Sequence, residues 1–461
     1  MSLPSEDKDK LSGRLDQLER AVVLLAQKFQ EIAGLMHQAE EKYSGPLLSA
    51  VEMIRNVDQK TLALHSAALL TDMARAHPKK DIVLFKGRGY FGDNIKYAFL
   101  AFTERAAEHG VEHYFVPGGV DQEKMLRQAG LPCLPATFED YRQEELAILL
   151  STKLVVYDEQ YIPPNWRTMT QHALMNGARK LQLWHGIPMK RIGMETLTAR
   201  QLADPMMVEL LHSMGPYDAL VATSAASEES WRRQLMFTQF APIGYPRDDV
   251  LLRDCTERDW LNVDQDVLAL LRDKKGKPAI CYAPTFRDNN QGAWLEQINL
   301  DKIAAACAAR DWHFIVNLHP YEHQHIPRLR QQYPAVHFVE SGCDVFPILK
   351  FCDVLVTGYS SIAFDYLLLD RPIVFYRPNH VEYVNESRTL VDGHERYLCG
   401  PVADTHDALI QQLERAIQVD HNPEKDTYRS HRHALAHDLY DVRDGKAGDR
   451  VCQLILQQLR K

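Results

Sequence analysis

The sequence predicts an α/β protein with two doubly wound domains that face each other across a cleft, preceded by a helical N-terminal extension. Two series of short β-branched or aromatic segments alternate with helical stretches, as in parallel sheets. The 461 residues are too many for one ordinary domain. We expect domains at residues 77–240 and 241–430, a helical region at 1–76, and a C-terminal helical segment at 431–461 that packs back across both domains.

Composition and charge exclude several classes of protein. Hydrophobic residues make up 45% of the chain and charged residues 25%, as in a soluble globular protein. The 53 basic and 62 acidic residues give a net charge of −9, so we expect no nucleic-acid partner. No apolar stretch approaches the roughly 20 residues of a membrane helix, and the polar N-terminus lacks a secretory signal. The eight cysteines form no C-x-x-C pair, which indicates reduced thiols in the cytoplasm and no metal cage.

The N-terminal region carries a heptad pattern. Apolar residues recur at alternating spacings of four and three over residues 11–36, which predicts a coiled coil and therefore a homo-oligomer. The alternative is an amphipathic helix folded onto the chain's own body, because Val23 and Leu24 widen the apolar stripe. We favour self-association. A second helical stretch follows at about 47–76.

Ten strands are predicted, five in each domain. The join between the domains is expected near residues 241–244. The first series comprises residues 82–85, 113–116, 154–157, 181–184 and 219–222. The second comprises residues 279–282, 313–316, 336–339, 353–356 and 373–376.

Polar residues gather in five clusters, four of them close behind these strands and one at the join between the domains. Gly or Pro turns the chain beside the polar side chains in every case. Because open α/β sheets bind ligands beyond the carboxyl ends of their strands, we expect these clusters to meet in one cleft. They occupy residues 184–188, 244–248, 283–287, 318–320 and 357–361.

Ser360 and Ser361 open the helical run 362–369. Free backbone N–H groups, two hydroxyls and the positive end of the helix dipole would together bind a phosphate group. The alternative is plain N-capping by serine. A strand precedes the Gly-Tyr-Ser-Ser turn, and this context favours a phosphate-binding role over simple capping.

Two histidines and one arginine are candidates for the chemistry. His185 lies between a strand and a Gly-x-Pro turn with Lys190 close behind, so its imidazole can take a proton from an attacking hydroxyl. A core histidine bonded to backbone is the alternative, and His319 allows the same two interpretations. Arg287 would brace a diphosphate bidentately, or pair with a surface carboxylate.

Signals for metals and cofactors are poor. The histidines at 319, 323 and 325 lack a convincing carboxylate geometry for zinc. The chain has no Walker motif and no G-x-G-x-x-G. The segment 87–94 follows the first strand, but its glycine spacing does not fit a dinucleotide turn, so we interpret it as a substrate contact or as a simple strand–helix turn.

Several motifs occur in a fixed order along residues 81–450. They are Gly89-Tyr90 with Asp93-Asn94, Trp184-His185-Gly186-Ile187-Pro188 with Lys190, Gly244-Tyr245-Pro246-Arg247, Thr285-Phe286-Arg287, His319-Pro320, Tyr359-Ser360-Ser361 with Asp365, and Asp444-Gly445-Lys446 with Arg450. Together they resemble the CDP-glycerol glycerophosphotransferase family, which builds teichoic-acid-like poly(polyol phosphate) chains.

The resemblance implies a GT-B architecture of two Rossmann-like domains and a role for each matching residue. His185 and His319 would be catalytic, with His185 as base on the acceptor hydroxyl and His319 at the diphosphate. The residues implied to bind the donor are Gly244, Tyr245, Pro246, Arg247, Thr285, Arg287, Thr357, Ser360, Ser361, Asp365, Lys446 and Arg450. Those implied to bind the acceptor are Gly89, Tyr90, Asp93, Asn94 and Lys190.

The resemblance also implies the reaction and its setting. Glycerol phosphate or ribitol phosphate would pass from CDP-glycerol or CDP-ribitol to a hydroxyl of a glycan or poly(polyol phosphate) acceptor that is lipid-linked, with release of CMP and without metal or cofactor. We expect a cytoplasmic protein, peripheral at the inner face of the cell membrane. Ile187 stands where the family often has Thr, and Gly358 where it often has Asp, so the choice of polyol is left open.

Two other functions remain as alternatives. One is a GT-B nucleotide-sugar glycosyltransferase of surface polysaccharide synthesis, because a fold alone does not distinguish a sugar from a polyol phosphate. The other is a non-catalytic scaffold that oligomerises through residues 11–36 and binds a nucleotide.

Overall fold

The computed structural model describes residues 66–158, 166–204, 216–285, 298–318, 320–386, 389–420 and 423–461, together with Lys28 and Met207. The chain separates into two compact units, Met1–His65 and Ser66–Lys461. Lys28 is helical. The rest of the predicted coiled coil at 11–36, and with it the predicted oligomer contact, lies outside the described residues.

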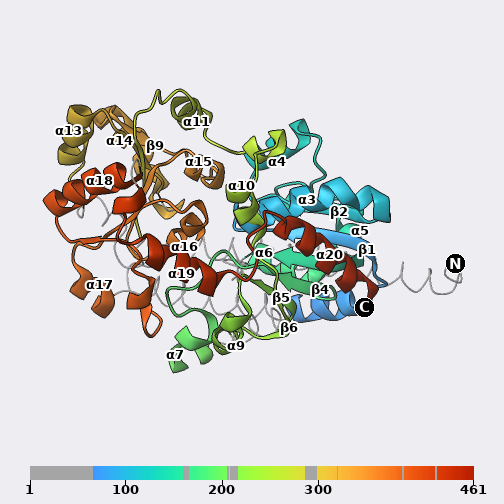
Figure 1. Cartoon of the computed structure of the whole chain (residues 1–461). Coiled ribbons are helices and arrows are strands. Elements are labelled where there is room, and N and C mark those ends of the chain that lie inside the picture. Colours follow the sequence, from blue (N-terminus) through green and yellow to red (C-terminus); the bar gives the residue numbers. More distant parts are fainter. Residues whose placement is uncertain are drawn as a thin grey trace, which may run out of the picture. The chain divides into compact units, whose positions relative to one another are not determined.

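The second unit contains two parallel six-stranded sheets (Figure 1). The first sheet has the order β2-β1-β3-β4-β5-β6 and the second β12-β11-β10-β7-β8-β9. We call the parts built on them the first and second lobes. The strands of the first sheet are β1 (Lys80–Lys86), β2 (Glu112–Val116), β3 (Thr152–Tyr157), β4 (Arg179–Gln182), β5 (Tyr217–Ala222) and β6 (Phe237–Pro242). Those of the second are β7 (Ala279–Ala283), β8 (His313–Val316), β9 (Val336–Phe338), β10 (Val354–Thr357), β11 (Ile373–Tyr376) and β12 (Val402–Ala403).

The prediction of an α/β protein with parallel sheets is confirmed, and all ten predicted strands are present. β6 and β12 were not predicted. β6 carries polar residues and ends in a proline, and β12 has only two residues, so neither has the continuous apolar pattern of a buried strand.

Helices connect the strands, and residues 66–76 are helical as well. In the first lobe they are α3 (Asp93–His109), α4 (Val120–Gln128), α5 (Gln143–Ser151), α6 (Trp166–Met175), α7 (Ala199–Leu202) and α9 (Glu228–Gln234). The crossing to the second lobe contains α10 (Asp249–Leu252) and α11 (Gln265–Arg272). The remaining helices are α13 (Leu300–Arg310), α14 (Ile326–Gln332), α15 (Phe346–Leu349), α16 (Ile362–Tyr366), α17 (His380–Glu386), α18 (His406–Asp420), α19 (Arg429–Leu439) and α20 (Ala447–Arg460).

Each sheet has one point at which the chain order reverses. In the first sheet, β1 and β3 are neighbours while the chain proceeds outward in opposite directions from them. In the second sheet, β7 and β10 have the same relation. Ligands of doubly wound sheets bind beyond the carboxyl ends of the two strands at such a switch point. The topology therefore marks the residues after β1, β3, β7 and β10.

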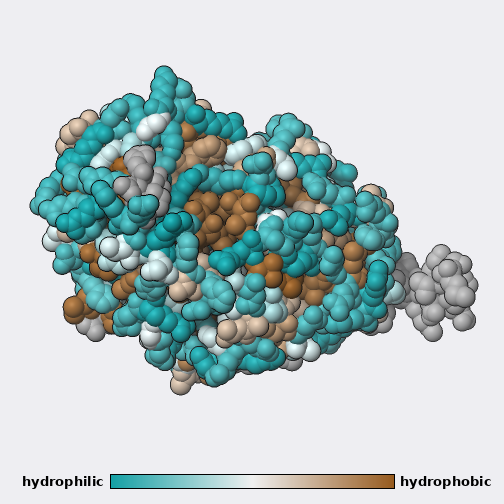
Figure 2. Space-filling view, in the orientation of Figure 1, coloured by the Kyte–Doolittle hydropathy of each residue, from teal (hydrophilic) through white to brown (hydrophobic). Residues whose placement is uncertain are grey.

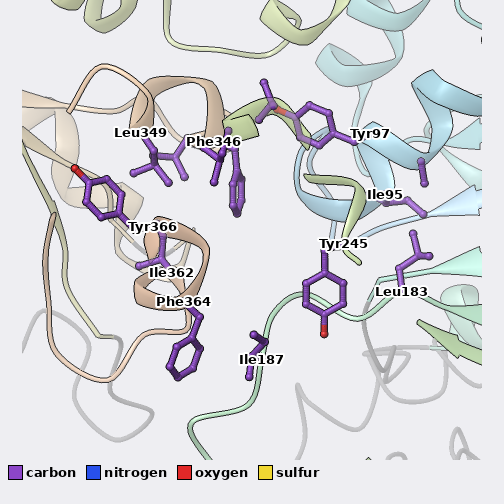
Figure 3. Close-up of a cluster of buried hydrophobic side chains, with 14 of the residues drawn as sticks. Ile95, Tyr97, Leu183, Ile187, Tyr245, Phe346, Leu349, Ile362, Phe364 and Tyr366 are labelled. Atoms are coloured by element: carbon purple, nitrogen blue, oxygen red, sulfur yellow. The ribbon is translucent and has the colours of Figure 1, made fainter. Parts of the chain in front are cut away.

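The two lobes share one hydrophobic core. A single cluster of buried side chains includes residues of both sheets and of the helices between them. Figure 3 shows its centre, where side chains from the two lobes face each other. The first lobe contributes Ile95, Tyr97, Leu183, Ile187 and Tyr245, and the second Phe346, Leu349, Ile362, Phe364 and Tyr366.

A buried ion pair reinforces this contact. The Lys96 ammonium on α3 lies 2.7 Å from the Asp344 carboxylate of the second lobe, and both side chains are at most 1% exposed. Tyr97 also donates to this carboxylate at 2.6 Å. Lys96 completes its three donors on the carbonyls of Asp259 and Leu261. Because every donor of the buried ammonium is used, the pair holds the lobes in one register.

The C-terminal segment contacts both lobes. α19 packs on the turn after α16 and on residues 225–227 of the first lobe. α20 packs on α3 and β3, where Arg105 lies 2.7 Å from Asp449. The domain limits at 77, 241 and 431 stay predictions.

The surface is mainly hydrophilic on the face drawn in Figure 2, with a hydrophobic area near the position of α16 and α10 in Figure 1. Among the helices that the structure describes, none has the length and apolar character to cross a membrane.

The buried pair yields a stability prediction. Lys96→Met leaves the Asp344 carboxylate without its cation, so the free energy of unfolding should fall by about 3 kcal/mol. Lys124→Met removes an exposed partner of Asp121 at 3.6 Å and should change it by less than about 0.5 kcal/mol. Urea unfolding of both variants measures the difference. Equal stabilities would show that the pair does not hold the lobes.

Candidate active site

The turn after β4 has a strained backbone. Trp184 has a φ of 56° and Gly186 a φ of 138°, and a left-handed conformation is costly for a bulky residue. Asn94 donates to the Trp184 carbonyl at 2.8 Å, and the Trp184 N–H donates to Gln182 Oε1 at 2.8 Å. These two bonds hold the turn and thereby orient His185 between its strained neighbours.

His185 is anchored at the switch point of the first sheet. Its Nδ1 lies 2.8 Å from the carbonyl oxygen of Asp158, the residue that follows β3. A carbonyl only accepts, so Nδ1 carries the proton and Nε2 holds the lone pair. Burial and the nearby Arg88 charge lower the pKa of His185 to about 3. The imidazole is therefore neutral at pH 7, and its Nε2 can take a proton from a hydroxyl.

Arg247 connects this turn to the second lobe. Its guanidinium donates to Asp93 Oδ1 at 2.6 Å, to the His185 carbonyl at 2.7 Å, and to both oxygens of Asp365 at 2.7 and 2.9 Å. Asn94 Oδ1 accepts from the Arg247 backbone N–H at 3.2 Å. The side chains of Arg247, Asp93 and Asp365 are at most 4% exposed. In this arrangement the Arg247 charge is compensated by carboxylates of the protein itself.

The pKa values of two carboxyl groups in this network are shifted in opposite directions. Burial raises the pKa of Asp93, but Arg247 and Arg88 outweigh that effect and hold it well below the ordinary value. Burial and the neighbouring Asp365 raise the pKa of Asp248 well above its usual range. The Arg247 guanidinium thus lies between Asp93 and Asp365, and Arg88 lies 2.7 Å from Asp93 Oδ2.

The loop of His185 meets the predicted phosphate turn of the other lobe. A Cβ added to Gly186 would lie 2.6 Å from Ser361 Oγ and 3.0 Å from Arg247 Nη2. Ser360 and Ser361 are half-buried, and the Ser361 hydroxyl makes no capping hydrogen bond to α16. The structure thus brings the predicted base loop next to the predicted phosphate residues and does not use Ser361 as a cap.

The switch point of the second sheet holds two more predicted donor residues. Thr285, after β7, accepts a hydrogen bond from the Tyr359 backbone N–H at 2.7 Å. Thr357, at the end of β10, donates to the Ala283 carbonyl at 2.8 Å. Both threonines therefore tie β7 to β10 and fix the turn that leads to Ser360.

The other predicted donor residues divide into two places. Tyr245 and Pro246 are buried beside Arg247, and the Tyr245 hydroxyl donates to the Gly186 carbonyl at 3.4 Å. Gly244, Lys446 and Arg450 lie where the C-terminal segment joins the first lobe. There Arg450 donates to the Ile243 carbonyl at 2.7 Å and to Asp444, and a Cβ on Gly244 would lie 3.4 Å from Arg450 Nη2. Lys446 is exposed.

The predicted acceptor residues are not all together. Asp93 and Asn94 are buried in the Arg247 network. Tyr90 accepts a hydrogen bond from Arg88 at 3.0 Å, and Gly89 lies against Gly118. The Lys190 ammonium lies 5.8 Å from the ring centroid of Tyr383 in the second lobe.

His319 and Arg287 lie outside the described residues, so their predicted roles stay predictions. Within the ranges that the structure does describe, no group of three His, Cys, Asp or Glu side chains could hold a metal ion.

Sequence reasoning missed two residues of the site. Asp158 holds His185 and directly follows β3, and Arg377 lies under the Tyr359 ring and directly follows β11. The signal that could have found both is their position one residue after a predicted strand.

Comparison with known proteins identifies the family. A family model described as CDP-Glycerol:Poly(glycerophosphate) glycerophosphotransferase matches residues 69–457. The chain belongs to this family. It is therefore an enzyme of the CDP-glycerol glycerophosphotransferase type.

Individual members of the glycerophosphotransferase family are distant relatives. The chain is 25% identical over 430 residues to a teichoic acid glycerol-phosphate transferase of Staphylococcus aureus, covering 88% of this chain and 100% of the relative. It is 27% identical over 280 residues to a teichoic acid ribitol-phosphate primase of Bacillus spizizenii, covering 60% and 68%. A structure of the wall teichoic acid polymerase TagF with CDPG is 18% identical, with a TM-score of 0.67 over 90% of this chain and 99% of that chain. This likeness supports the fold.

The close approach at Gly186 yields a prediction. Gly186→Ala places a Cβ within 2.6 Å of Ser361 Oγ at a strained φ, so the turn must shift and transfer should fall by at least ~10-fold. Gly110→Ala has a φ of 63° and no neighbour within 4 Å, so it carries the conformational cost without the clash. Transfer rates and melting temperatures of both variants test this. Equal losses of activity would mean that the Gly186–Ser361 contact has no role.

Proposed function

We propose that this protein transfers glycerol phosphate or ribitol phosphate from a CDP-activated donor to a hydroxyl of a growing surface polymer or its glycan primer, with release of CMP. The observation that carries this proposal is the contact of the His185 loop with Ser361, which joins a neutral imidazole to a candidate phosphate site. The names of the relatives, which include transferases, primases and polymerases of teichoic acid, support the substrate class. The two parallel sheets support a GT-B arrangement.

His185 acts as the general base in this mechanism. Its Nε2 accepts the proton of the acceptor hydroxyl as the oxygen attacks the phosphorus that bears the polyol. A bond forms between that oxygen and phosphorus, and the bond from phosphorus to the bridging oxygen of the diphosphate breaks. Ser360, Ser361 and His319 hold the diphosphate, and CMP leaves with the electron pair of the broken bond.

A large cavity beside the His185 loop offers room for the acceptor. It has a volume of about 1030 Å³ and is lined by Ile187 and Pro188 of this loop, by Thr223 and Ser224 after β5, and by Arg396 of the second lobe. A volume of this order suits a ligand as large as several sugar or polyol units. We assign the acceptor to this cavity and expect a lipid-linked acceptor to bring the enzyme to the inner membrane face.

Donor screening with the purified full chain tests the function. CDP-glycerol or CDP-ribitol should release CMP and transfer its polyol phosphate to a glycan primer or a poly(glycerol phosphate) oligomer, with EDTA present as well as absent. His185→Ala should lower the transfer rate by at least ~100-fold with donor affinity nearly unchanged. His337→Ala, at a half-buried histidine on β9, is the matched control and should leave the rate unchanged.

Each other outcome points to a different function. Turnover of UDP-sugars instead of CDP-polyols would indicate a glycosyltransferase. Nucleotide binding without turnover of any donor would indicate a scaffold. Near-normal transfer by His185→Ala would show that another group is the base.

A further inference from the structure

Arg377 is a buried cation that forms an ion pair with no carboxylate of the described residues. It directly follows β11, and the residue is 5% exposed. Its Nε donates to the Gly358 carbonyl at 3.1 Å, and its guanidinium carbon lies 4.3 Å from the ring centroid of Tyr359. Its Nη2 is buried and has no hydrogen-bond partner. Burial lowers the pKa of Arg377, in keeping with a charge that lacks compensation.

The other buried arginines are compensated. In the described ranges, the arginines with such low exposure are Arg247, Arg377 and Arg432. Arg247 pairs with Asp93 and Asp365, and Arg432 pairs with Asp426 and Asp370. Among the described residues, the Arg377 guanidinium has the Gly358 carbonyl, the rings of Tyr359 and Phe375 and the distant charge of Glu395, but no ion pair. A guanidinium does not lose its proton in a protein. A buried charge without a counter-charge is costly, so its presence indicates that an anion completes it.

The position of Arg377 indicates which anion pairs with it. β11, β10 and β7 are neighbouring strands of the second sheet, and the switch point lies between β10 and β7. A Cβ on Gly358 would lie 3.1 Å from Thr285 Oγ1 and 3.3 Å from the Tyr376 carbonyl, which places Arg377 beside the ends of all three strands. Ligands of such sheets bind there.

Other polar groups surround the same turn. Tyr359 stacks on Tyr383 with ring centroids 3.9 Å apart, and its hydroxyl lies 2.5 Å from His380 Nδ1. Lys190 of the first lobe lies 5.8 Å from the Tyr383 ring centroid. Glu395 acts on Arg377 through space, and its carboxylate lies 3.7 Å from His394 Nδ1. The turn before Ser360 thus lies among Arg377, Lys190 and His380.

We propose that Arg377 is a positioning residue that supplies the counter-charge of the donor's diphosphate at the β7–β10 switch point and holds the Gly358–Tyr359 turn against it. This inference rests on the proposed function, because that function supplies the diphosphate. Arg377 acts through the field of its charge in a region of low dielectric and through the Gly358 carbonyl.

Ligands of increasing charge test the proposal. Binding of cytidine, CMP, CDP and inorganic pyrophosphate to the full chain is measured by calorimetry for wild type, Arg377→Gln and Arg377→Lys. Arg377→Gln should lower the affinity for CDP and pyrophosphate by at least ~10-fold. It should lower the affinity for CMP by a smaller factor and that for cytidine by less than ~2-fold. Arg377→Lys keeps the charge but loses the planar contact with Tyr359 and the Nε bond, so its affinity for CDP and pyrophosphate should lie between those of wild type and Arg377→Gln. In transfer assays Arg377→Gln should raise KM for the donor more than it lowers kcat.

Matched variants keep the test decisive. Arg371→Met removes an arginine near the amino end of the same strand, which donates to the carbonyls of Lys350 and Cys352, and should change none of these affinities. If Arg377→Gln does not fold, Arg377→Met serves as the neutral variant. The proposal would be overturned if Arg377→Gln lowered the affinity for all four ligands equally. It would also be overturned if Arg377→Lys lost as much affinity for CDP and pyrophosphate as Arg377→Gln. Wild-type binding of pyrophosphate but not of CDP would instead refute the proposed donor while the anion site remains.

Discussion

The arrangement of the candidate site depends on one buried guanidinium. Arg247 needs its two carboxylates because a buried cation without them would cost several kcal/mol. Asp93 comes from the start of α3 in the first lobe and Asp365 from α16 in the second, so the same ion pairs that solvate Arg247 also join the lobes. A further bond, to the His185 carbonyl, extends this constraint to the base. Loss of any one partner would therefore affect both lobe contact and site geometry.

The turn after β4 is stabilised by the hydrogen bonds and the core packing around it. Trp184 has a left-handed backbone conformation that is costly for a bulky residue, and Gly186 has a positive φ that glycine alone adopts without cost. Asn94, Gln182, Tyr245 and Arg247 hold the peptide groups around His185, and the shared hydrophobic core excludes water from them. The neutral imidazole results from the same burial that strengthens these bonds.

Sequence reasoning succeeded where the signal is local. β-branched and aromatic runs predict ten of the strands because parallel strands are buried on both faces. The motif matches predict the family. They do not predict the network of Arg247, because its partners are 154 and 118 residues away and depend on how the lobes pack. That Arg247 and Asp365 bind the donor, and Asp93 and Asn94 the acceptor, stays a prediction. Arg377 has no motif around it, and only its place after β11 indicates a role.

The transfer kinetics of Arg247→Lys test the account most directly. A lysine keeps the charge but cannot donate to Asp93, Asp365 and the His185 carbonyl with the same geometry. If Arg247 positions the base, kcat should fall at least ~10-fold while CDP affinity stays within ~3-fold. Arg253→Lys, whose arginine pairs with Asp259 away from His185, should change neither. A wild-type kcat in Arg247→Lys, or a loss of CDP affinity without a change in kcat, would contradict the account and make Arg247 a donor ligand.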